Sequence, residues 1–208
     1  LMAETSKKLN TSLDEFDLFL KARYARTGNA IIAKRNPDLY AKGGTRHGMT
    51  NDQADQLLAQ FQAEGKTKAF ENLAKIIYQM QDLKLKLIEK YGLETPEIIQ
   101  SMRDTHGEYY VPAKGKSGEP SLPGKGAGLD IKSSGLKAAL GRMSPSENSI
   151  IHTINDLEAT IRRVHQAEVG QKFLDLVEKY PEPGIEVNKV QLSQRYNPTT
   201  GEVETYNK

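Results

Sequence analysis

The chain contains no cysteine, and this is the most restrictive of its absences. Without thiols it forms no disulfides, no thiolate zinc sites and no cysteine nucleophile. It also lacks any apolar run close to the roughly 20 residues that a helix needs to cross a bilayer. Its first residues have no hydrophobic segment typical of a secretory signal. Because the sequence starts with Leu1 and stops just after a strand-like segment, we expect a piece of a longer protein.

A strong charge of one sign is also missing, since the formal net charge of the 208 residues is +2. So small a charge gives no overall attraction to nucleic acid. Lys and Arg are in excess in residues 1–50 and 111–144, and Asp and Glu in residues 51–110 and 145–208. This alternation favours a chain that packs on itself or on copies of itself.

Nucleotide-binding motifs fail on their spacing. The stretch Gly124–Gly128 does not match G-x-G-x-x-G and follows Pro123 rather than a strand. A P-loop would need Gly at position 119 and Ser or Thr at position 126, where the chain has Glu119 and Gly126. We therefore interpret this stretch as a plain flexible loop.

Metal-ligand and catalytic patterns are equally sparse. No pair of histidines has the H-x-x-x-H spacing of a zinc site. The cluster of Asp104, His106 and Glu108 lies where a helix end runs into an extended segment, so these side chains need not converge. We predict no metal, no cofactor and no catalytic residue. Because a catalytic triad is a spatial arrangement that spacing does not reveal, an enzyme stays a second alternative.

Helix signals dominate the sequence, in two forms. Capping motifs occur at Ser12–Glu15, Thr50–Gln53, Thr95–Glu97 and Ser144–Glu147, and each precedes the start of an apolar periodicity of three and four residues. The predicted helices span residues 12–35, 51–64, 66–91, 95–105 and 145–180. Apolar positions predicted to face the core include Leu13, Phe16, Leu20, Tyr24, Ala54, Leu57, Leu58, Phe61, Phe70, Leu73, Ile76, Ile77, Met80, Leu83, Leu87 and Tyr91.

The longest predicted helix begins with a Ser144 N-cap and Pro145 at its first position. Its apolar residues recur in steps of three and four, at Ile150, Ile154, Leu157, Ile161, Val164, Leu174 and Val177. Ala167 and Gly170 have almost no side chain, so we predict a close helix contact there. The pattern indicates a packing element rather than an active site.

Between and after these helices the composition changes. Residues 113–135 are rich in Gly, Pro, Ser and Lys, which predicts an exposed and mobile loop or linker. Residues 185–196 and 202–206 flank Asn197–Gly201, a pattern typical of a β-hairpin, and the extended Tyr109–Val111 is a candidate to pair with it. We predict a mainly α multi-helix bundle with one long C-terminal helix, a long Gly/Pro/Lys loop and a small antiparallel hairpin. The N-terminal helical part spans 1–112, and residues 136–208 pack on it, which favours one domain.

Basic residues near the N-terminus offer a nucleic-acid interface. They are interleaved with Tyr24 and Tyr40, whose rings could stack on bases. The candidate residues are Arg23, Arg26, Lys34, Arg35, Lys42 and Arg46. The alternative interpretation of such charges is the solvated side of a helix.

Several segments, in order along most of the chain, resemble the non-enzymatic regions of the large polyvalent proteins of tailed phages and related mobile elements. The resembling segments are residues 13–23, Asn29, Asn36–Pro37, Gly48–Ala54, Tyr110–Pro112, Ala139–Arg142, Glu168–Leu176 and Asn197–Val203. The resemblance implies a protein that travels inside the virion and enters the host cell, cytoplasm or periplasm, with the genome. It carries over no catalytic residue.

The leading hypothesis is therefore a non-catalytic helical scaffold or interaction segment. Its expected partners are other virion or phage proteins, neighbouring domains of the same chain, or a second copy. The first alternative is a nucleic-acid-binding module of the same kind of protein, with DNA as the weaker partner, because duplex binding rests on many phosphate contacts.

Overall fold

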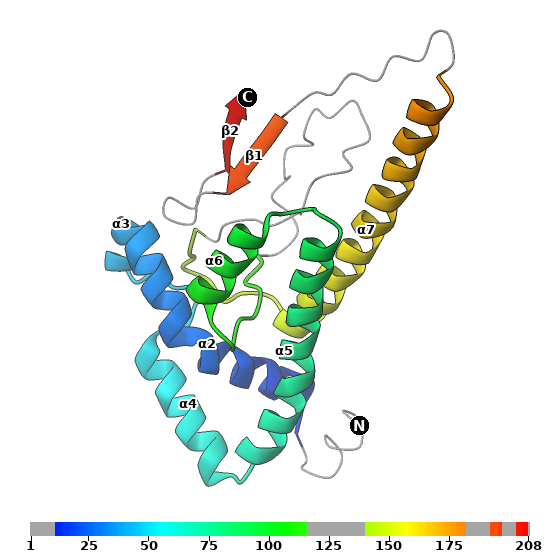
Figure 1. Ribbon diagram of the computed structural model, residues 1–208. Coiled ribbons are helices and arrows are strands. Elements are labelled where there is room, and N and C mark those ends of the chain that lie inside the picture. Colours follow the sequence, from blue (N-terminus) through cyan, green and yellow to red (C-terminus); the bar gives the residue numbers. More distant parts are fainter. Residues whose placement is uncertain (1–10, 116–139, 182–191, 197–202, 208) are drawn as a thin grey trace.

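The computed structural model describes residues 11–115, 140–181, 192–196 and 203–207 (Figure 1). As predicted, the chain is mainly helical, and the bounds of the five predicted helices agree with the observed ones to within two residues except at the start of the last helix. The helices are α2 (Leu13–Arg35), α3 (Pro37–Ala41), α4 (Asn51–Ala63), α5 (Thr67–Lys90), α6 (Pro96–His106) and α7 (Ser149–Lys179). The short helix α3 was not predicted.

Local capping chemistry starts three of these helices where the sequence predicts. Ser12 begins α2 and Thr50 begins α4, and both form complete capping boxes with the residue three positions on. The Thr95 side chain accepts the Ile98 backbone N–H at the start of α6, with Pro96 at the first helical position. Each motif satisfies backbone donors that have no partner inside the helix.

The predicted start of α7 is wrong by four residues. Its N-cap is Asn148, whose side chain accepts the N–H groups of Ile150 and Ile151, and not Ser144. The residues between Ser144 and Asn148 form backbone hydrogen bonds with distant segments instead. The N–H of Ser146 donates to the His47 carbonyl at 3.0 Å, and the N–H of Glu147 donates to the Lys114 carbonyl at 3.0 Å. The chain therefore cannot turn into a helix until residue 149.

Strands β1 (Leu192–Tyr196) and β2 (Val203–Asn207) pair antiparallel, with Leu192 opposite Asn207 and Tyr196 opposite Val203. The turn predicted between them and most of the predicted loop 113–135 lie outside the described residues. Residues 109–111 form no strand and do not join this sheet in the described part of the chain. Instead the Val111 side chain is fully buried among the helices, which explains its apolar character.

The main core lies where α2 crosses α4 and α5. Phe16 and Phe19 of α2 meet Phe61 of α4 and Phe70 of α5, with ring centroids 5.2–6.2 Å apart. Tilted and edge-on ring pairs of this kind add to the burial of the rings themselves. A second cluster joins Ile88, Leu93, Ile99 and Val164, and packs the end of α5 against α6 and α7.

A buried ion pair on α2 holds the N-terminus of α7. The carboxylate of Asp17 lies 2.6 Å from Lys21 Nζ and accepts the Ser149 backbone N–H at 2.7 Å. Lys21 Nζ also donates to the Ser146 carbonyl at 2.9 Å. A carboxylate beside the first N–H groups of a helix also complements the helix dipole. The start of α7 is thus fixed by side chains more than a hundred residues away.

The face of α7 that packs on α5 is more polar than predicted. Thr153 and Thr160 are buried, whereas Ile154 and Ile161, which we predicted to face the core, are 48% and 40% exposed. The reason lies on α5, where Gln81 is buried and donates to Thr153 Oγ1 at 3.0 Å. Leu13 and Leu83, also predicted to face inward, are each 46% exposed.

Candidate functional site

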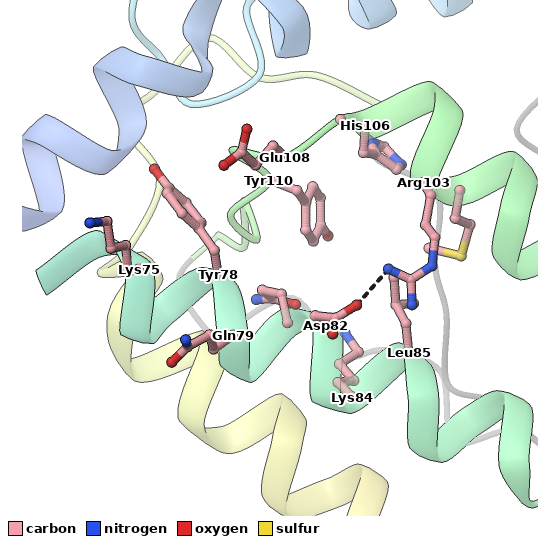
Figure 2. A pocket seen from close by; sticks show the side chains of 13 residues that line it. Lys75, Tyr78, Gln79, Asp82, Lys84, Leu85, Arg103, His106, Glu108 and Tyr110 are labelled. Carbon is pink, nitrogen blue, oxygen red and sulfur yellow. Dashed lines mark hydrogen bonds and ion pairs between the residues drawn. The ribbon is translucent and has the colours of Figure 1, made fainter. Parts of the chain in front are cut away.

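A cavity of about 490 Å³ opens between α5, α6 and the turn that follows α6. Its lining combines apolar surface with Tyr78 and Lys84 of α5, Arg103 and His106 of α6, and Tyr110 (Figure 2). We call it the α5–α6 pocket. Of these five residues, the sequence analysis considered only His106 as a possible site residue. The others belong to separate segments that contain no recognisable motif.

Two cationic groups of the α5–α6 pocket, Arg103 and Lys84, face carboxylates. Arg103 Nη1 donates to Asp82 Oδ1 at 2.6 Å across the pocket (Figure 2), and Lys86 Nζ lies 2.7 Å from the other carboxylate oxygen. Hydrogen bonds from Lys86 and Arg103 lower the pKa of Asp82 against a smaller opposing effect of burial, so this carboxylate stays ionised. Lys84 is buried with its Nζ 3.5 Å from Asp156 of α7.

His106 is buried and tied to the core rather than free to exchange protons. Its Nδ1 lies 2.8 Å from the Tyr24 hydroxyl. Burial, followed by the nearby charges of Arg46, Arg35 and Lys84, lowers the pKa of His106 to about 3. A group with that pKa is a weak base near neutral pH. Burial likewise raises the pKa of the Tyr78 phenol to about 12. Burial thus moves the pKa values of both Tyr78 and His106 away from neutrality.

Behind the pocket wall lies a second unusual group, the buried guanidinium of Arg46. It is 4% exposed, and its Cζ lies 5.9 Å from the ring centre of Tyr24 and 5.7 Å from that of Tyr110. Among the described residues, its Nε and Nη1 have no hydrogen-bond partner. Two aromatic faces thus supply its main electrostatic compensation. Arg46 is a core residue and does not lie on a surface that could meet phosphates.

The other candidate nucleic-acid residues differ in their exposure and in their partners. Arg23 Cζ stacks 4.1 Å from the ring centre of Tyr109, and Arg26 pairs with Asp55 of α4. Arg35 is partly buried, whereas Lys34 and Lys42 are exposed.

The predicted helix-packing residues lie on the inner side of α7. Ala167 is partly buried against the cluster of Ile88, Leu93, Ile99 and Val164, and Gly170 is buried. The close backbone approach expected at Gly170 stays a prediction.

Two of the histidines, His47 and His106, pack against the same ring, that of Tyr24, with ring centroids 5.9 and 6.5 Å away. His47 is buried, with its Nδ1 3.0 Å from Ser146 Oγ, and burial lowers its pKa well below the usual range. His152 faces Glu147, with 3.1 Å between Nε2 and Oε2, and His165 is exposed. Within the described residues, no group of three or more His, Asp or Glu side chains has the arrangement of a metal site.

Six exposed large apolar side chains of the described residues lie along α7. They are each 40–66% exposed, and we call them the α7 stripe: Ile151, Ile154, Ile161, Val169, Phe173 and Leu176. Sequence reasoning placed Ile154 and Ile161 in the core and did not single out the other four. The sequence does hold a signal for them. The apolar residues of α7 cover two adjacent faces of the helix, which is a wider apolar surface than a single packing partner would bury.

Comparison with known proteins finds no matching family, curated protein or solved structure. None of the helices in the described ranges has the length and apolar character required to cross a membrane.

Proposed function

We propose that this chain is a non-catalytic helical interaction segment of a large phage protein that is packaged in the virion and enters the host with the genome. The observation that carries the binding role is the α7 stripe. Exposed large apolar side chains that gather on one side of a helix are a common feature of surfaces that bind other proteins. The resemblance to polyvalent phage proteins supports the virion context.

The chemistry of the α5–α6 pocket supports a role in binding rather than turnover. Its histidine is a weak base, and Arg103 and Lys84 each face a carboxylate. General acid–base catalysis works best with a proton donor or acceptor whose pKa lies near the working pH. Among the described pocket residues, the titratable groups with resolved shifts have pKa values moved away from neutrality.

Photo-crosslinking in assembled particles tests the proposal. A benzophenone amino acid is introduced into the chain in the phage or mobile element that encodes it. It replaces Phe173 of the stripe in the test variant and Lys68, on an exposed part of α5, in the control. Purified particles are irradiated, and the adducts are identified by mass spectrometry. We expect the chain in the particles, with an adduct to a virion protein or a second copy from position 173 and none from position 68.

Two results would contradict the proposal. One is absence of the chain from purified particles, and the other is the lack of any adduct specific to position 173. Salt-sensitive binding of DNA that is lost when Arg23, Arg26, Lys34 and Arg35 are replaced would favour the nucleic-acid alternative instead.

A further inference from the structure

We infer that the α7 stripe pairs with the α7 stripe of a second copy of this chain, with the two helices antiparallel. This inference rests on the proposed function, because it names the partner of the proposed binding surface. It follows from the order of apolar and charged residues along the exposed side of α7.

Four of the six stripe residues, Ile154, Ile161, Val169 and Leu176, are self-complementary about His165, whereas Ile151 falls opposite Lys179. A two-fold axis through His165 places a residue that precedes His165 in one copy opposite the residue that follows His165 by the same number of positions in the second copy. Ile154 then meets Leu176 of the second copy, and Ile161 meets Val169. Ile154 and Leu176 are 22 residues apart, which is about six turns, so they lie on the same side of the helix. Phe173 falls opposite the partly buried Leu157.

The charges inside the stripe obey the same symmetry. Glu158 falls opposite Lys172 of the second copy, and the pairing occurs twice because of the two-fold axis. Both side chains are more than half exposed, and within one copy Glu158 pairs with Arg162 and Lys172 pairs with Glu168, neighbours on the same helix. Parallel helices would instead place Glu158 against Glu158 and Lys172 against Lys172, which is unfavourable.

The stripe is accessible along its length. The opposite side of α7 packs on α5 through Thr153, Thr160 and Val164, all of which are buried. Figure 1 shows the C-terminal half of α7 extending beyond the other described helices. A second α7 can therefore lie along the stripe without displacing α5.

The expected affinity follows from the size of the contact. From Ile151 to Leu176 the helix is about 38 Å long and about 10 Å wide, so two copies bury roughly 800 Å² in total. Stable interfaces generally exceed about 1,000 Å². The pairing of stripes alone should therefore be weak, with a Kd of roughly 10 μM.

Charge reversal tests the pairing and its direction. Sedimentation equilibrium and light scattering are measured for the whole chain up to about 100 μM, well above the expected Kd. We expect the wild type to dimerise and E158K and K172E each to weaken the dimer about tenfold, because two attractive pairs become repulsive. An equimolar mixture of E158K and K172E should regain wild-type affinity, since every contact then joins opposite charges. K68E, a charge reversal away from the stripe, should dimerise as the wild type does.

The mixture distinguishes pairing from damage to the fold, since misfolded variants would not restore each other. A wild type that stays monomeric at about 100 μM, or a mixture that shows no recovery, would overturn antiparallel self-pairing. A monomer whose position 173 still crosslinks to a different virion protein would overturn the self-pairing but keep the proposed function. A monomer without such a crosslink would overturn both.

Discussion

Replacing Asp17 with alanine should be among the most destabilising substitutions in the chain. The side chain is 7% exposed and has two partners, the Lys21 ammonium at 2.6 Å and the Ser149 N–H at 2.7 Å. Removing one member of a buried ion pair costs about 3–5 kcal/mol, because the other charge is left buried without a partner. We therefore expect D17A to lower the free energy of unfolding by about 4 kcal/mol.

Two further variants separate the stranded charge from the helix contact. D17N keeps an oxygen acceptor for the Ser149 N–H but removes the charge, and we expect a loss of about 2 kcal/mol. In D17A/K21M the unpaired ammonium is gone, so the double variant should be more stable than D17A by at least about 1 kcal/mol. The measurement is urea unfolding followed by circular dichroism.

Asp14 supplies the matched control, since it is an exposed aspartate in the first turn of the same helix. D14A should change the free energy of unfolding by no more than about 1 kcal/mol, the range of a surface charge near a helix N-terminus. A loss below about 1 kcal/mol for D17A, or a double variant no more stable than D17A, would refute the role assigned to the buried pair.

Three other substitutions probe the residues around Tyr24. The pKa of His106 is about 3 in the folded chain and near 6.5 in the unfolded chain. Between pH 3 and pH 6.5 the unfolded chain therefore binds more protons than the folded chain, so the free energy of unfolding falls as the pH drops below 6.5. Urea unfolding at pH 7 and pH 5 should show a His106 contribution of about 2 kcal/mol that disappears in H106F. R46M should unfold at an equal or higher urea concentration than the wild type, because it removes a buried guanidinium with two nitrogens that have no partner among the described residues. A large loss of stability would show that the contacts of Arg46 with the tyrosine rings outweigh the cost of burying its charge. G28A should lower the melting temperature even though alanine favours helices, because its Cβ would lie 2.8 Å from Arg46 Cγ and 3.0 Å from Tyr24 Cε1; an unchanged temperature would mean that Arg46 moves aside.

Sequence reasoning located the helices well wherever the deciding chemistry is local. Ser12 with Glu15 and Thr50 with Gln53 are neighbours on the first helical turn, so their capping bonds form whatever the rest of the chain does. Ser144 carries the same type of motif, but its segment is used by residues that are distant in sequence. No local pattern reveals that His47 and Lys114 accept backbone bonds from this segment.

The polar contact between α5 and α7 escaped prediction for a different reason. Hydrophobic periodicity assigns apolar residues to the core, yet Gln81 and Thr153 are buried because they satisfy each other. The apolar residues beside Thr153 then face outward and form the α7 stripe. Complementary polar pairs on two helices cannot be recognised until the helices are known to be neighbours.

The candidate site was the least predictable part. His106 drew attention as a possible ligand, but its actual partner, Tyr24, lies 82 residues earlier. Arg46 was interpreted as a surface cation because arginine is rarely buried without a paired carboxylate. Its burial between two tyrosines depends on the crossing of α2 with the segment after α6, which only the folded chain reveals.

The contact between Asp17 and the start of α7 also sets an order of events during synthesis. The two partners are 132 residues apart, and ribosomes add about 5–20 residues per second, so Asp17 leaves the ribosome roughly 7–26 seconds before Ser149 does. Helices α2, α4 and α5 can assemble their aromatic core in that interval. The buried pair of Asp17 and Lys21, however, lacks the Ser149 N–H until α7 has been made. Until then, the side of α5 that packs on α7 is also exposed to solvent. Arrival of α7 is therefore the step that closes the fold of the nascent chain.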